Sequence, residues 1–164
     1  MTEQEQRAYD YWQQYHWAIP LADAEERMFP RSEMDYKQFL PADPTHARAW
    51  IPDFVRYAKR AAVNFRCPIS GWLETDWYRG IGGGPFRKVG SLTMDHIVPG
   101  AAGGLTTDEN IRAMSFLANS KKGHKLLTDE ELSRQIHSSY RIVEMPADLL
   151  EVLNKYGITQ YRLG

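Results

Sequence analysis

Residues 91–125 read SLTMDHIVPGAAGGLTTDENIRAMSFLANSKKGHK, and this stretch decides how the rest of the chain is interpreted. It contains a carboxylate beside an imidazole, two separate amides and a lysine pair, namely Asp95-His96, Asn110, Asn119 and Lys121-Lys122. Carboxylate and amide oxygens suit a hard divalent cation, a neutral imidazole can take a proton from water, and lysines suit a polyanion. The stretch therefore indicates the chemistry of a metal-dependent phosphodiester hydrolase.

The order and spacing of these residues resemble the HNH (ββα-metal) nuclease motif, written loosely as D-H-I-x-P, G-G, N-[IL] and N-x-x-K. The matching elements are Asp95-His96-Ile97-Val98-Pro99, Gly103-Gly104, Asn110-Ile111 and Asn119-Ser120-Lys121-Lys122. From His96 to Asn110 is fourteen positions, and from Asn110 to Asn119 is nine. Because asparagine takes the place of the second histidine, the layout is similar to the HNN variant of the family.

The resemblance implies a role for each of these residues. Asp95 and Asn119 would bind Mg²⁺ or Mn²⁺, because both supply oxygen and neither favours a softer metal. His96 would be the general base, with Asn110 hydrogen-bonded to the loop that holds the histidine. The basic residues expected to contact nucleic acid are Arg112, Lys121, Lys122 and Lys125.

The same stretch predicts a strand, a long loop, a returning strand and a helix. Residues 91–96 alternate in polarity, residues 97–109 are rich in glycine, and residues 111–113 are expected to form a short returning strand. A helix is expected over residues 115–122, with Gly123 as its stop. We predict an α+β fold in which a central ββα-metal (HNH) motif is embedded in mainly helical flanks.

The flanks suggest three parts: a helical N-terminal subdomain (1–65), the HNH core (66–127) and a C-terminal helical flank (128–164). Helices are expected at about residues 3–17, 22–28, 33–40, 52–65 and 128–138, and from residue 146 to a stop at residue 157. Residues 80–85, GIGGGP, are expected to form a hairpin tip or surface loop.

Many proteins that carry this motif also hold a structural zinc ion between two C-x-x-C pairs. The corresponding positions here are Cys67, Ser70, Ser115 and Ala118. Three of the four are poor zinc ligands, so no structural zinc is expected, and packing by Trp72, Trp77 and Tyr78 would replace it.

Charge is unevenly distributed along the 164 residues, whose formal net charge is −1. Residues 56–125 carry eleven Lys and Arg against five acidic residues, a net charge of +6, and the remainder carries −7. A basic centre is compatible with DNA, expected to be double-stranded, bound at the middle of the chain, whereas the simpler interpretation is a mixed surface.

Composition also bears on location. A polar, acidic N-terminus and the lack of an apolar run of about 20 residues predict no signal peptide and no membrane partner. A single cysteine excludes an internal disulfide and fits a cytoplasmic protein. The oligomeric state is left open.

Three functions are consistent with this sequence. The first is a DNA endonuclease of phage, homing or restriction type. The second is a ribonuclease or a nonspecific toxin nuclease that uses the same residues. The third is a DNA-binding protein that has the HNH fold but does not cleave, and joint retention of Asp95, His96 and Asn119 argues against it.

Overall fold

The computed structural model describes residues 2, 3, 6, 7, 9, 10, 51, 53–99, 102–104, 107–123 and 125–162. Of the first predicted helix, the described positions 3, 6, 7, 9 and 10 are helical. The helices predicted at residues 22–28 and 33–40 lie outside the described residues. Within these described residues the fold is α+β, as predicted, with helices and two small sheets.

The chain divides into two compact units. The first comprises Met1–Ala62 and Met94–Ala113, and the second comprises Val63–Thr93 and Met114–Gly164. The contiguous core predicted for residues 66–127 is not one of these units. Asp95, His96 and Asn110 belong to the first unit and Asn119 to the second.

In the first unit, helix α3 (Asp53–Ala62) buries Phe54 and Val55, and Asp53 begins it. It ends three residues earlier than predicted, before Asn64 and Phe65 adopt φ angles of 53° and 57°. Such left-handed backbone cannot continue a right-handed helix.

Strands β3 (Thr93–His96) and β4 (Ile111–Met114) form the two-stranded sheet. The Thr93 hydroxyl donates to the Met114 carbonyl, and the Ile97 amide donates to the Asn110 carbonyl. Contacts in this order show that the strands are antiparallel. A short 3-10 helix, η4 (Asp108–Asn110), leads directly into β4.

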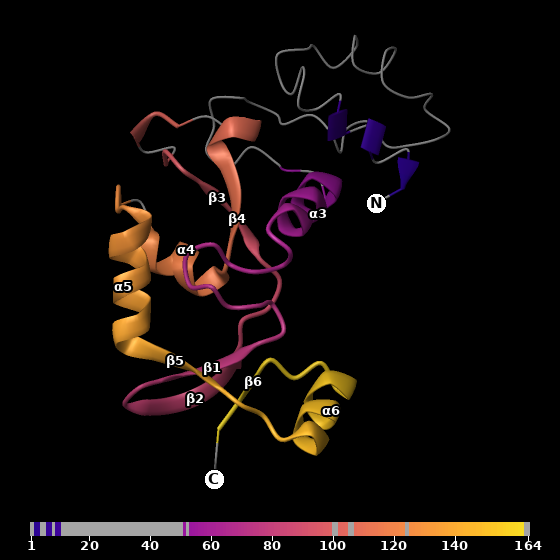
Figure 1. Ribbon diagram of the computed structural model, residues 1–164, viewed down its shortest axis with the longest axis vertical. Coiled ribbons are helices and arrows are strands. Elements are labelled where there is room, and N and C mark those ends of the chain that lie inside the picture. Colours follow the sequence, from indigo (N-terminus) through magenta and orange to yellow (C-terminus); the bar gives the residue numbers. More distant parts are fainter. Residues whose placement is uncertain are drawn as a thin grey trace. The chain divides into compact units, whose positions relative to one another are not determined.

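The second unit contains a four-stranded sheet in the order β5-β1-β2-β6 (Figure 1). Its strands are β1 (Trp77–Gly80), β2 (Gly83–Lys88), β5 (Tyr140–Val143) and β6 (Gln160–Tyr161). All neighbouring pairs are antiparallel, and β1 and β2 form a hairpin closed by the pair Gly80 and Gly83. A Cβ at Gly80 would lie 2.7 Å from the Gly83 carbonyl oxygen, so glycine is required there.

Three helices complete this unit: α4 (Phe116–Lys122), α5 (Asp129–Ser139) and α6 (Ala147–Lys155). The Ser115 hydroxyl caps α4 and the Thr128 hydroxyl caps α5, each by accepting a backbone N–H. Gly123 ends α4 with a φ of 55°. These three helices lie close to where the sequence predicted them.

The C-terminal part is not only helical, and this corrects the prediction of a helical flank. β5 follows α5 at once and pairs with β1, and β6 pairs with β2 near the end of the chain. Both strands are short and lie at sheet edges, so their sequences lack the strong alternation that identifies a half-buried strand. β1 lies inside the sheet, and it was missed because its four residues are too few for an alternating pattern to be recognised.

Candidate functional site

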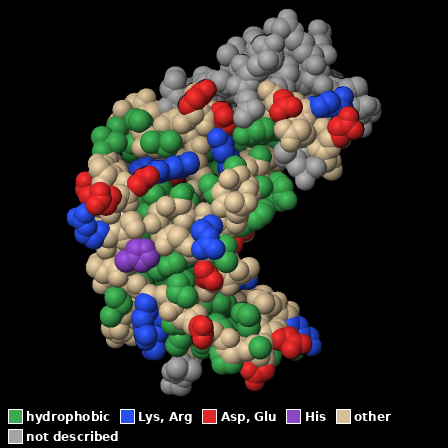
Figure 2. Space-filling view, viewed as in Figure 1, with side chains coloured by type: hydrophobic (Ala, Val, Ile, Leu, Met, Phe, Trp, Pro, Cys, Tyr) green, Lys and Arg blue, Asp and Glu red, His purple; other side chains and the backbone are tan. Residues whose placement is uncertain are grey.

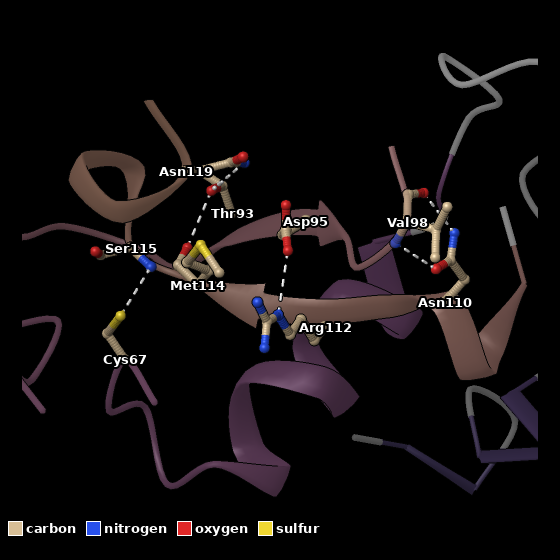
Figure 3. Close-up of polar contacts among 9 residues, drawn as sticks. All are labelled: Cys67, Thr93, Asp95, Val98, Asn110, Arg112, Met114, Ser115 and Asn119. Atoms are coloured by element: carbon tan, nitrogen blue, oxygen red, sulfur yellow. Dashed lines mark hydrogen bonds and ion pairs between the residues drawn. The ribbon is translucent and has the colours of Figure 1, made fainter. Parts of the chain in front are cut away.

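Asp95 and His96 are the last two residues of β3. Asp95 is only 4% exposed, and its Oδ2 accepts a hydrogen bond of 3.1 Å from Nε of Arg112 on β4 (Figure 3). His96 is half-buried. The carboxylate therefore has its charge balanced within the sheet, while the imidazole stands where the strand opens into the loop.

Asn110 holds the loop that follows His96. Its Oδ1 accepts from the Val98 amide at 2.8 Å, and its Nδ2 donates to the Val98 carbonyl at 3.0 Å (Figure 3). The Asn110 backbone carbonyl also accepts from the Ile97 amide at 2.9 Å. Three hydrogen bonds thus join Asn110 to the two residues after His96, and the resemblance implied contacts of this kind.

The glycine pair of the motif lies against the same segment. A Cβ on Gly104 would overlap the Val98 carbonyl and approach Asn110 Nδ2 to 3.0 Å. Gly103 has a φ of 87°, which side-chain-bearing residues rarely adopt. The close approach of the loop to Val98 therefore depends on glycine at position 104.

The end of the loop is braced by residues that the sequence analysis did not select. Lys59 of α3 forms a 2.6 Å ion pair with Asp108 and also donates to the Asp108 carbonyl at 2.9 Å. The Tyr9 hydroxyl donates to the same carboxylate at 3.3 Å. The Thr107 hydroxyl accepts from the Asn110 amide and caps η4. A threonine followed by two acidic residues is a helix-start signal, and it could have marked this turn.

Asn119 lies on α4, in the second unit. Its Nδ2 donates to the Thr93 hydroxyl at 3.1 Å, and that hydroxyl donates in turn to the Met114 carbonyl (Figure 3). This chain of hydrogen bonds ties α4 to the first residue of β3, the strand whose last two residues are Asp95 and His96. Thr93 is a second supporting residue that the sequence did not single out.

The four predicted nucleic-acid contacts differ in exposure. Lys121 and Lys125 are exposed, Arg112 is paired with Asp95, and Lys122 is 2% exposed. A phosphate could reach Lys122 only by displacing the residues that cover it. On the face shown in Figure 2, the Lys and Arg side chains that the structure describes are interspersed with acidic and apolar ones.

Three of the four positions that the sequence analysis compared with zinc-binding pairs are joined through the Cys67 sulfur. The Cys67 thiol is fully buried and accepts backbone hydrogen bonds from Ser70 at 3.5 Å and Ser115 at 3.4 Å. Ser70 and Ser115 use their hydroxyls to accept from the amides of Trp72 and Ala118. Burial raises the pKa of the Cys67 thiol, but hydrogen bonds from Ser115 and Ser70 outweigh it, and the pKa lies below its ordinary value.

No group of three or more His, Cys, Asp or Glu side chains that could hold a metal occurs in the described part of the chain. Mg²⁺ does not need such a cluster, because it keeps several waters and takes one or two protein oxygens. A carboxylate such as Asp95 and an amide such as Asn119 each belong to the chemical type of ligand that Mg²⁺ or Mn²⁺ takes.

Comparisons with protein families, with characterised proteins and with solved structures find no match for this chain. Among the described helices, none has the length and apolar character required to cross a membrane.

Proposed function

We propose that this chain is a divalent-metal-dependent DNA endonuclease of the HNH type. The observation that carries the proposal is the two-sided hydrogen bonding of the Asn110 side chain to Val98. Val98 is two residues past His96, so Asn110 restrains the segment that positions the imidazole. A catalytic base must be held in a fixed geometry, and a loop rich in glycine does not fix one by itself.

In this proposal, His96 in its neutral form accepts a proton from the attacking water. Only the neutral imidazole has a ring nitrogen that can accept this proton. Asp95 and Asn119 supply oxygen ligands, and a bound Mg²⁺ would shield the negative charge that develops on the phosphate and on the leaving oxygen. Asn110 is a positioning residue.

The buried pairing of Asp95 with Arg112 favours a second candidate, a nucleic-acid-binding protein that does not cleave. The Asp95 carboxylate is 4% exposed and paired with a guanidinium, and this ion pair explains the presence of a carboxylate at the site without a metal. A ribonuclease with the same residues is the remaining alternative. Substrate and metal tests separate all three.

The deciding experiment incubates the purified protein with supercoiled plasmid and with structured RNA, each in Mg²⁺ or in EDTA. We expect plasmid cleavage in Mg²⁺ alone. His96→Ala should lower the rate by about 10²–10⁴, the usual cost of losing a general base, with thermal stability and DNA binding nearly unchanged. His137→Ala is the matched control, because it removes an exposed imidazole on α5.

Each remaining outcome excludes one candidate. Cleavage of RNA alone replaces the DNA endonuclease with a ribonuclease. DNA binding with no cleavage in Mg²⁺ supports the non-cleaving protein. Near-normal turnover by His96→Ala would remove His96 from the role of base.

A further inference from the structure

The second unit contains a pocket of about 410 Å³ whose lining is basic and aromatic. It lies between the β1–β2 hairpin, α4 and the junction of α5 with β5. The side chains that matter are Tyr78, Arg87, Lys121 and Tyr140. None of the described residues that line the pocket is acidic. This volume lies within the range of about 300–1,000 Å³ that is common for ligand pockets. The pocket can therefore hold a small ligand that is larger than one phosphate group.

Strand pairing places the charge and the phenol beside each other. Arg87 on β2 is the cross-strand partner of Tyr78 on β1. Burial raises the pKa of Tyr78, and the nearby Arg87 charge opposes this only in part, so the phenol stays protonated at neutral pH. A protonated phenol beside a guanidinium offers a hydrogen-bond donor together with positive charge.

The other wall is built from α4 and β5. Lys121 Nζ lies 5.5 Å from the ring centre of Tyr140, and that ring meets Tyr78 edge to face at 5.6 Å. Among the residues that the structure describes, no carboxylate pairs with Arg87 or Lys121. Two exposed cations without acidic neighbours in one pocket leave positive charge for an anion to balance.

We propose that this pocket binds a phosphate of a nucleic-acid strand together with part of its attached nucleoside. The expectation that the ligand is a nucleic acid rests on the proposed function. Arg87 and Lys121 supply the charge, and the Tyr78 hydroxyl supplies a neutral donor. The volume beyond the phosphate and the aromatic wall accommodate sugar and base. Lys121 belongs to the motif stretch, whereas Arg87 lies outside it and is brought to the pocket by the hairpin.

The test measures binding without cleavage. The full-length His96→Ala protein is titrated in EDTA against a fluorescein-labelled oligonucleotide between about 50 and 200 mM salt, a range over which phosphate contacts weaken measurably. Fluorescence anisotropy reports binding. Arg87→Gln and Lys121→Gln should each weaken binding about four- to five-fold near 0.15 M salt and lower the salt slope by about one. Lys155→Gln, at an exposed lysine on α6 outside the pocket, should change neither quantity.

Arg87→Lys keeps the charge and should retain the salt slope, which separates loss of a contact from loss of folding. If the binding curves of both glutamine variants superimpose on that of Lys155→Gln, the pocket does not bind the strand. Inorganic phosphate and a nucleoside monophosphate serve as competitors that distinguish the source of the phosphate. The substitutions could leave the affinity for the oligonucleotide unchanged and weaken the affinity for inorganic phosphate. In that case the site holds a free anion and the proposal is overturned.

Failure of the inference and failure of the proposed function give different results. If the unsubstituted protein cuts neither DNA nor RNA in Mg²⁺, the nuclease proposal fails even when the pocket variants lose affinity. If it cuts DNA while the pocket variants bind normally, only the pocket assignment fails.

Discussion

The Cys67 sulfur joins two segments of the second unit through backbone hydrogen bonds. This sulfur is fully buried and accepts two backbone N–H groups, one from Ser70 and one from Ser115. From the sequence, loss of this thiol would create only a small cavity, at a cost of about 1 kcal/mol. Two buried amides that lose their acceptor add a further penalty. Because sulfur is a weak acceptor, we take about 1–3 kcal/mol for the two amides together.

We therefore predict that Cys67→Ala lowers the free energy of unfolding by about 2–4 kcal/mol, through the cavity and the unmet amides together. Cys67→Ser should cost less, because it retains an acceptor. Urea unfolding of the two variants and the parent measures this. Equal stability of Cys67→Ala and the parent would show that the N–H to sulfur contacts contribute nothing.

At Asp95 and Asn119 the prediction concerns metal dependence. Asp95→Asn preserves volume and an acceptor for Arg112, and Asn119→Ala removes the amide. Each should raise the Mg²⁺ concentration for half-maximal cleavage by at least the roughly 10–100-fold seen when groups supporting metal ligands are lost. Asn154→Ala, an exposed amide on α6, is the control. If the Mg²⁺ titration curve of either variant superimposes on that of the parent, the substituted residue is not a metal ligand.

At the level of elements, the loop between β3 and β4 depends on one glycine. In Gly104→Ala the new methyl would overlap the Val98 carbonyl, so Val98 must move and its hydrogen bonds with Asn110 must break. We predict a loss of about 2 kcal/mol or more in stability and a fall in cleavage at least as large as that of Asn110→Ala.

The control for this prediction is Gly82→Ala in the β1–β2 hairpin, where a Cβ meets nothing within 4 Å. Thermal unfolding and plasmid cleavage of the two alanine variants are compared with the parent. Parent-like behaviour of Gly104→Ala would show that the loop relaxes around the methyl group. The site would then not require glycine at position 104.

The elements also differ in how far the sequence predicted them. α4 and α5 begin at hydroxyl caps and α4 stops at a glycine, and these signals lie within a few residues of the helix that they bound. β1, β5 and β6 carry no comparable local signal, since each becomes a strand only by pairing with another segment. Hydrogen bonds of a helix are local, whereas those of a sheet are not.

At the level of the whole molecule, we predict that the protein folds without zinc. A structural zinc site usually requires four good ligands, and Ser70, Ser115 and Ala118 are not among them. Elemental analysis of the purified protein should find no stoichiometric zinc, and EDTA should leave the melting temperature unchanged. One zinc per chain, or a marked loss of stability in EDTA, would contradict this account of the second unit.

The sequence by itself determined the motif residues, the order of strand, loop, strand and helix, and the caps of the helices, because these depend on identity and short-range geometry. Tertiary structure alone decided that Asp95 pairs with Arg112, that Lys59 braces Asp108, and that Lys122 is buried while Lys121 lines a pocket. Ion pairs and burial depend on which segments meet in space. The sequence alone does not show whether a charged side chain pairs with a carboxylate, is covered by another segment or faces solvent.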